Sequence, residues 1–482
     1  MKLLNTKSKL IKDLSANGIQ IIVNQIIGLV LFYFSSTYLL KESFGHYNWA
    51  LAVGSTVIAI LSFGLDLIVV KRVASGKEAR EVVGMHLLHV IVSGAIALIF
   101  LLLFYAIYEG DNGEGRLNIL LPVFVYLVIG NVANSFKLCL NGLEAYQSLA
   151  VVLVTANVLK LVGVALLFFI GHFGLDEMLL VYVLASIVEL FLAAVFANKN
   201  FDRAIRPRIN WGAYFELVKE ALPQLGVVLF DSALARIDWI LLGLMGTAIA
   251  TAEYSFTYRV FELSKLPLLI LSPILLTRLT KLFGLGTERD LQKEKDVLAY
   301  FKLEMIVMMV IPIVLVQVWS PLVDLITHGK YGAVNEVTYS ILAICVPLHA
   351  LINFLWTMAF VKGMLKPIMW ITVVSSLINI VANLILIPKF SAVGAAVAFL
   401  ISTVVQTILY FVLYRKMEIK LKMRGSFMVL IFAFVAVAFG RYVSVNLAAE
   451  VLVSLFVFVM LSVLGKQLEL NQLKTILKTG KA

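Results

Sequence analysis

Residues 229–243 read LFDSALARIDWILLG and lie within a run, 221–245, that is otherwise mostly apolar. About 20 mostly apolar residues are enough for an α-helix to cross a bilayer. This run nevertheless holds three charged side chains, Asp231, Arg236 and Asp238. Each of them costs roughly 2.5–3.5 kcal/mol at the centre of a membrane helix on insertion scales. The stretch therefore predicts a membrane-spanning helix whose charges have a role.

The whole chain has the composition of an integral membrane protein. Of its 482 residues, 61% are hydrophobic and 14% are charged, and its mean hydropathy is +0.98. Soluble domains average about 45–50% apolar and about 25% charged residues. Fourteen runs are long enough to span a membrane, and they lack the alternation of barrel strands. We expect an all-α polytopic fold with spans at approximately 15–40, 46–70, 83–108, 117–140, 149–171, 177–197, 221–245, 252–279, 299–319, 337–361, 368–387, 393–414, 426–445 and 448–465.

The distribution of Lys and Arg predicts the orientation of the chain. Of the 40 basic residues, thirty fall in segments on one side of the predicted spans and five on the other. Basic residues concentrate in cytoplasmic loops, so we expect both termini in the cytoplasm. Anionic lipid attracts basic residues spread over inner loops. This accounts for the net charge of +11 without nucleic-acid binding.

The spacing of the runs predicts two halves. We expect an N-terminal six-helix bundle at 1–198, a cytoplasmic basic connector at 199–220, and a C-terminal six-helix bundle at 221–415. An extra helix pair at 426–465 and a cytoplasmic tail at 466–482 follow. The connector contains RPRINW and an amphipathic stretch that suggests a helix lying along the inner interface. Two parallel six-span halves are typical of transporters.

The sequence gives little support for catalysis. It has no Ser–His–Asp order, no HExxH, no phosphate-binding Gly-rich loop and no long aqueous loop for a donor sugar or metal. Cys139 and Cys345 lie inside predicted spans and are interpreted as packing residues, and so are His86 and His89. We therefore expect no enzyme, no metal and no cofactor, and leave coupling to H⁺ or Na⁺ open.

Polar groups inside the spans define a candidate substrate path. Its members are charged or amide side chains at span positions: Arg236, Arg259, Lys265, Lys160, Asp231, Asp238, Glu262, Glu189, Asn17, Gln20 and Asn24. Arg236 lies 200° around the helix from Asp238, at about 100° per residue, so its partner comes from elsewhere. Arg259 is matched to Asp238 in depth, and Lys160 to Glu189.

Two interpretations of these groups are open. Any single pair is consistent with an ion pair between helices, and the three amides are equally consistent with packing against polar groups. However, buried ion pairs add little stability over apolar packing. Charges clustered in spans mark substrate or ion pathways more often. Because both halves carry them, the set favours a hydrated path between the halves.

Several stretches of the chain resemble the polysaccharide flippases (Wzx-type) of the multidrug/oligosaccharidyl-lipid/polysaccharide (MOP, MATE-like) superfamily. ARIDWILLG and TAEYSFTYRVFEL are similar to that family's spans seven and eight, and 378–402 to its junction of spans eleven and twelve. FGLDLIVVKRVA is similar to the end of span two. The matching residues are Arg72, Asp238, Gly243, Tyr254, Ser255, Asn379, Asn383, Ile387, Pro388, Gly394, Ala395 and Ala396. Trp239 and TAIATAEY depart from the family pattern, and this departure concerns the assignment to a subfamily rather than to the superfamily.

The resemblance implies translocation of an undecaprenyl-diphosphate-linked oligosaccharide across the bacterial inner membrane by alternating access, for O-antigen, capsule or exopolysaccharide synthesis. Arg236, Arg259, Lys265 and Lys160 would then receive the diphosphate, and the three amides would bind sugars. Implied partners are this lipid-linked oligosaccharide, the membrane, and the polymerase and glycosyltransferases of the same pathway. The alternatives are a cation-coupled drug exporter of the same superfamily and, less favoured, a membrane-embedded glycosyltransferase or polymerase.

Overall fold

The computed structural model describes residues 20, 22–76, 78–108, 116–201, 203–283, 291–417, 424–443, 446–465 and 467. The chain forms two compact units, Met1–Gly243 and Leu244–Ala482, and each is described by itself. The described residues are overwhelmingly helical and contain no strand, which confirms the predicted all-α class. Ten of the described helices are long and apolar enough to cross a membrane, and two shorter apolar helices, Ile22–Tyr38 and Met428–Val443, accompany them. The predicted number of fourteen spans stays a prediction.

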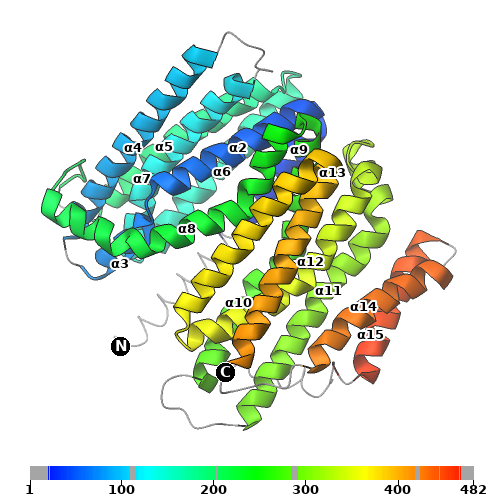
Figure 1. Ribbon diagram of the computed structural model, residues 1–482. Helices are drawn as coiled ribbons and strands as arrows, with labels where there is room; N and C mark the ends of the chain where they lie inside the picture. Colours follow the sequence, from blue (N-terminus) through cyan, green and yellow to red (C-terminus); the bar gives the residue numbers. More distant parts are fainter. Residues whose placement is uncertain are drawn as a thin grey trace, which may run out of the picture. The chain divides into compact units, whose positions relative to one another are not determined.

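The first unit is a bundle in which α5 is central (Figure 1). After the helix Ile22–Tyr38, the elements are α2 (Lys41–Leu61), α3 (Leu65–Ala74), α4 (Ala79–Tyr108), α5 (Arg116–Gly142), α6 (Tyr146–Phe169), α7 (Leu175–Asn198) and α8 (Trp211–Met245). Helix α5 packs against α2, α3, α4 and α7, and α6 packs against α7. Cys139 of α5 is fully buried in the apolar core of this unit, as its interpretation as a packing residue predicts.

Helices α2 and α3 replace the single span predicted over 46–70. The chain turns at 62–64, where Phe63 and Gly64 have φ of 54° and 70°. A side chain at Gly64 would bring its Cβ to 2.8 Å from the backbone nitrogen of Leu225 in α8. The turn therefore needs glycine for its conformation and for this close approach. Hydropathy alone does not reveal the break, because the residues on both sides of it are apolar.

The connector is also built differently from its prediction. Instead of a separate interfacial helix before span seven, one continuous 35-residue helix, α8, begins at Trp211 and includes that span. Leu217 and Ala221 belong to the same buried cluster as residues of α3 and α4. The start of α8 is thus part of the first unit, and the division into units follows Gly243 rather than the connector. The predicted bundle limits stay a prediction.

The second unit is built around α12. Its elements are α9 (Ala248–Ser264), α10 (Leu266–Phe283), α11 (Leu291–Thr327), α12 (Gly332–Val361), α13 (Leu365–Arg415), α14 (Arg424–Val443) and α15 (Leu447–Leu464). Helix α12 packs against α9, α10, α11 and α13, while α14 and α15 pair with each other and pack on α11. Helix α13 is two helices joined at Ser391, whose φ is 52°. Its two arms correspond to the spans predicted at 368–387 and 393–414.

Gly243, at the end of the first unit, allows α8 to lie directly against Trp49 of α2. An added Cβ would overlap the Trp49 indole, which is almost fully buried. We expect Gly243→Ala to lower the stability of the purified protein by about 1–3 kcal/mol, the usual cost of overpacking. Thermal unfolding in detergent measures this. Gly130→Ala is the matched control, since nothing lies within 4 Å of its Cβ position. Equal unfolding temperatures for the two variants would contradict the predicted overlap.

Candidate functional site

Arg236 of α8 is a partly buried cation that lies over an aromatic ring. Its guanidinium carbon is 4.7 Å from the centre of the Trp239 ring, and its Nη1 is buried without a hydrogen-bond partner. No carboxylate lies within ion-pair distance of Arg236 in the part of the chain that the structure describes. Its partner is therefore a π face, as is frequent for arginine. The guanidinium is planar and weakly hydrated, and its Nη1 makes no hydrogen bond, so it is well suited to bind a phosphate group.

Of the two acidic residues of α8 near Arg236, the structure describes the side chain of one, Asp238. Asp238 is fully buried, and its Oδ1 accepts a hydrogen bond from the backbone nitrogen of Trp239 at 3.2 Å. The Asp231 side chain lies outside the described residues. Asp238 belongs to the first unit and Arg259 to the second, so the predicted match in depth between them stays a prediction.

Lys160 of α6 is a second cation associated with aromatic rings. Its Nζ lies 5.7 Å from the centre of the Tyr182 ring, and that ring has edge contacts with Tyr47 and Tyr126. Glu189, which the sequence places at the same depth, instead forms an ion pair with Lys137 of α5 at 2.6 Å. Within the described chain Lys160 has no carboxylate at ion-pair distance. Lys137 falls within the span predicted at 117–140 but is not among the residues of the predicted path.

The second unit contains three of the predicted path charges. Among the described residues two of them form an ion pair and the third, Lys265, does not. Arg259 Nη1 lies 2.7 Å from Glu262 Oε2, one turn farther along α9. Lys265 occupies the junction between α9 and α10, and its Nζ lies 4.4 Å from the centre of the Phe261 ring. Among the described residues, Lys265 has no ion pair. Arg259 is thus paired within its own helix, whereas Lys265 lies against an aromatic face and interacts with Glu262 at longer range.

Packing explains part of the role of the three predicted path amides, Asn17, Gln20 and Asn24. Asn24 Oδ1 accepts a hydrogen bond from Asn157 Nδ2 of α6 at 3.0 Å. Gln20 lines a shallow pocket of about 440 Å³ together with Gln147 and Thr155. Asn17 lies outside the described residues. Asn24 therefore joins two helices, as one of the two open interpretations predicts.

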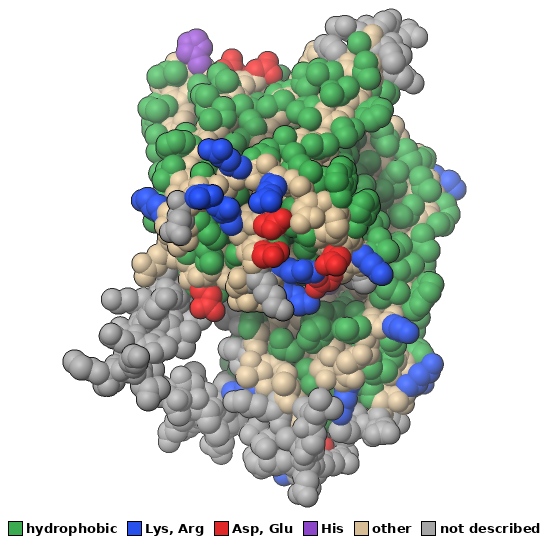
Figure 2. Space-filling model, turned by 90° about the vertical axis from the view of Figure 1, so that its left-hand side faces the viewer, with side chains coloured by type: hydrophobic (Ala, Val, Ile, Leu, Met, Phe, Trp, Pro, Cys, Tyr) green, Lys and Arg blue, Asp and Glu red, His purple; other side chains and the backbone are tan. Residues whose placement is uncertain are grey.

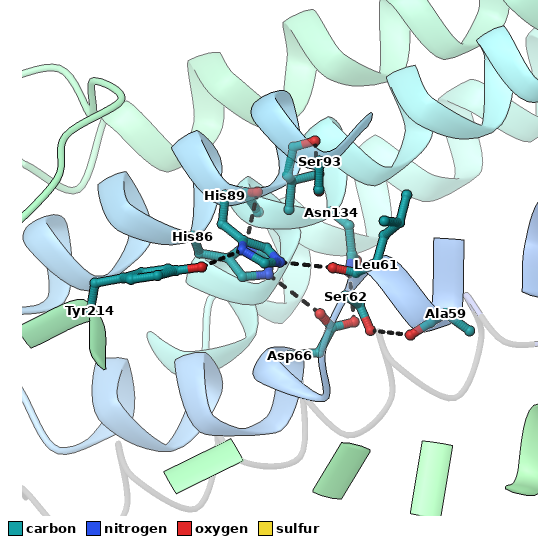
Figure 3. A network of polar contacts seen from close by, with 11 residues as sticks. Ala59, Leu61, Ser62, Asp66, His86, His89, Ser93, Asn134 and Tyr214 are labelled. Atoms are coloured by element: carbon teal, nitrogen blue, oxygen red, sulfur yellow. Dashed lines mark hydrogen bonds and ion pairs between the residues drawn. The ribbon is translucent and has the colours of Figure 1, made fainter. Parts of the chain in front are cut away.

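A histidine network connects five helices of the first unit (Figure 3). His86 and His89 project from α4 between Asp66 of α3 and Tyr214 of α8. His89 Nε2 donates to the carbonyl oxygen of Leu61 at 2.7 Å, and its Nδ1 lies 2.8 Å from the Tyr214 hydroxyl. His86 Nε2 lies 3.4 Å from Asp66 Oδ1. Its Nδ1 lies 2.9 Å from the hydroxyl of Ser135 on α5.

This network supports the break between α2 and α3. Leu61 is the last residue of α2, and the backbone nitrogen of Leu65 bonds to Ser62 rather than to Leu61. His89 therefore satisfies a carbonyl that the helix end leaves free. Asp66 lies in the first turn of α3, where a helix favours negative charge, and it also accepts from Asn134 at 3.1 Å. His89 thus has both ring nitrogens in hydrogen bonds, whereas His86 uses only Nδ1, and its buried Nε2 faces Asp66 without a hydrogen bond. The sequence did not indicate their partners, one of which is 125 positions away.

Of the two asparagines that carry the sequence resemblance in α13, Asn379 links its two arms and Asn383 bonds to Asn379. Asn383 Nδ2 donates to the Asn379 carbonyl at 2.9 Å and to its side-chain oxygen at 3.1 Å. Asn379 Nδ2 reaches Ser402 on the other arm at 3.4 Å. At Gly394 an added Cβ would collide with the Leu386 carbonyl. These motif residues therefore have a packing role at the bend.

Comparison with known proteins adds a family model and several similar folds. The model described as "Polysaccharide biosynthesis protein" matches residues 10–277, more than half of the chain. None of the curated protein sequences matches.

Three solved structures share the fold. Lipid II flippase MurJ in an inward closed conformation has a TM-score of 0.70 and 13% identity, over 92% of this chain and 97% of that one. An inward-facing multidrug resistance MATE family transporter of the MOP superfamily has a TM-score of 0.64 and 16% identity, over 81% and 94%. A MOP superfamily transporter from Pyrococcus furiosus has a TM-score of 0.59 and 15% identity, over 84% and 95%. At these identities the likeness establishes a MOP-type fold, as the sequence predicts.

Proposed function

Because the chain belongs to the polysaccharide biosynthesis protein family, we propose that it is a flippase for a polyprenyl-diphosphate-linked oligosaccharide, with undecaprenyl as the expected lipid. It moves this molecule from the inner to the outer leaflet for assembly of a surface polysaccharide. The likeness to lipid II flippase MurJ supports a substrate that is itself lipid-linked. The proposal involves transport by alternating access and no catalytic step.

The observation that carries the proposal is the set of cations without carboxylate partners. Arg236, Lys160 and Lys265 lie against aromatic rings, and the described residues give none of them an ion pair. Burying a charge in a membrane span costs free energy. A cation that has no counter-ion among the described residues is therefore suited to binding an anionic ligand. A diphosphate supplies that charge and accepts charge-assisted hydrogen bonds. We assign contacts with the diphosphate to Arg236 and Lys160 in the first unit and to Lys265 in the second.

We give the other predicted path residues secondary roles in substrate binding. Arg259 reaches a phosphate by exchanging Glu262 for it, since the pair is partly exposed. Gln20 and Asn24, with the undescribed Asn17, offer amides to sugar hydroxyls. Asp231 and Asp238 stay proposed members of the path, and Glu189 acts through its ion pair with Lys137. The polymerase and glycosyltransferases of the pathway are the proposed partners.

We further propose that the protein lies in the bacterial inner membrane with both termini in the cytoplasm. The distribution of basic residues supports this orientation. It places the loop between α3 and α4 and the connector before α8 on the cytoplasmic side.

Deletion of the gene tests the proposed substrate. We expect the surface polysaccharide to be lost while its lipid-linked repeat units accumulate, because their synthesis continues on the inner leaflet. Extraction and mass analysis of the polyprenyl-linked lipids, together with staining of the surface glycan, measure both effects. Wild-type protein supplied from a plasmid is the control.

The alternative is export of cationic drugs, as the likeness to a multidrug resistance MATE transporter suggests. A cationic drug requires an acidic binding region, whereas the three cations described above repel it. A deletion strain with normal surface glycan and new sensitivity to cationic drugs would favour the exporter and contradict the flippase.

A further inference from the structure

We propose that the first unit carries a binding site for the phosphate-bearing headgroup of an anionic phospholipid, separate from the substrate path. The site is a pocket of about 980 Å³ between the start of α4 and the extended segment that precedes α8. Its polar lining consists of Arg80, Arg203, Arg206, Arg208, Glu78 and Glu81. We call it the arginine pocket.

The charge of the arginine pocket favours an anion. None of its four arginines has an ion pair among the described residues, although two carboxylates share the lining. In contrast, the neighbouring Lys71 and Arg72 are both paired with Glu220, at 2.8 and 2.9 Å. Their hydrogen bonds hold the pKa of Glu220 below its usual value. Guanidinium groups match phosphate oxygens in a bidentate manner.

The backbone of the arginine pocket is held in place. Arg208 donates its backbone N–H to the Gly84 carbonyl at 3.2 Å, and the Ile205 N–H donates to Asn198 Oδ1 at 2.7 Å. The Ile205 side chain is buried in the core of the unit. A Cβ at Gly84 would lie 2.6 Å from the Arg206 carbonyl, so glycine permits this approach. The connector therefore presents its arginines from a fixed segment.

Exposed apolar residues on α8 place the arginine pocket at the membrane surface. Trp211 and Phe215 are 62% and 63% exposed, and their rings stack with centres 6.0 Å apart. Leu222 is exposed on the same helical face, seven residues farther along. Exposed aromatic residues of this kind favour the level of the lipid headgroups.

Figure 2 shows basic and acidic side chains gathered in one region of a face that is otherwise mostly hydrophobic. In the proposed orientation the arginine pocket is cytoplasmic, where anionic lipids attract basic groups. A pocket whose arginines have no ion pair among the described residues, beside exposed aromatic residues, fits a lipid headgroup better than a free phosphate ion. The lipid supplies both the phosphate and the adjoining apolar chains.

Native mass spectrometry of the full chain in detergent, titrated with phosphatidylglycerol or phosphatidylcholine, tests this proposal. We expect phosphatidylglycerol to bind more tightly, and its affinity to fall roughly fivefold for each arginine replaced by glutamine. The triple variant R203Q/R206Q/R208Q is then about 100-fold weaker. Glu78→Gln removes a negative charge from the lining and should tighten binding.

The matched control is K366Q/R415Q/K416Q, which removes three exposed basic side chains of the second unit. It should bind phosphatidylglycerol as the wild type does. An equal loss in this control would mean that only net charge matters and would overturn the site. If inorganic pyrophosphate displaced phosphatidylglycerol with an affinity equal to that of the lipid, the assignment of the pocket to a lipid headgroup would be overturned. None of these results depends on the transported substrate.

Discussion

Replacing Arg236 with glutamine is expected to lower transport about 10- to 100-fold, the usual worth of a hydrogen bond to a charged group. The amount of protein in the membrane should stay close to wild type, because Arg236 has no described ion pair whose loss would strand a buried charge. Arg236→Lys should retain part of the activity, since a point charge still attracts phosphate but loses the fork and the flat contact with Trp239.

Lys160→Gln provides an independent check of the same idea, because Lys160 lies on α6 and also faces an aromatic ring. Lys389→Gln, which removes an exposed cation, is the control for the change of net charge. Transport is measured as restoration of surface polysaccharide in the deletion strain, with protein level followed by immunoblot. An Arg236→Gln variant with full transport would remove Arg236 from the proposed path.

Replacing Lys137 with methionine is expected to destabilise the first unit by about 3–5 kcal/mol. Lys137 and Glu189 lie 2.6 Å apart, with side chains that are 17% and 9% exposed. Removing the lysine leaves the Glu189 carboxylate buried without its counter-ion. The double variant K137M/E189L should regain most of the stability, because apolar residues of similar size replace a buried pair at little cost.

Thermal unfolding of the purified protein and its abundance in the membrane measure these changes. Arg441→Gln is the matched control, since its partner Glu450 lies 3.3 Å away in a pair that is more exposed. Such pairs contribute about 0–1 kcal/mol. A double variant as unstable as Lys137→Met would show that the pair does not act as a unit.

The sequence predicted the helical class and most helix positions, because long apolar runs have few alternatives in a membrane. It did not predict the break at 62–64, which depends on the contact of Gly64 with the α8 backbone. Nor did it predict that α8 starts at Trp211, since the residues before span seven are polar enough to suggest a separate surface helix. Both features are decided by tertiary packing within the first unit.

For the candidate site, composition identified the charged residues but not their partners. Lys137 and Glu189 are 52 positions apart, and no spacing rule distinguishes Lys137 from Lys160 as the partner of Glu189. The pair of Arg259 and Glu262 is different, since a separation of three residues places both on one helical face. Local pairs could therefore be read from the sequence, whereas pairs between helices required the structure.

The most direct test of the proposed transport is a flipping measurement with the purified full chain in lipid vesicles. A labelled polyprenyl-diphosphate oligosaccharide is incorporated, and a glycosidase that cannot cross the membrane reports which leaflet holds the sugar. We predict that wild-type protein exposes the protected fraction to the enzyme, and that the double variant R236Q/K160Q does not. Equal rates of exposure in vesicles with and without the wild-type protein would contradict the proposed flippase function.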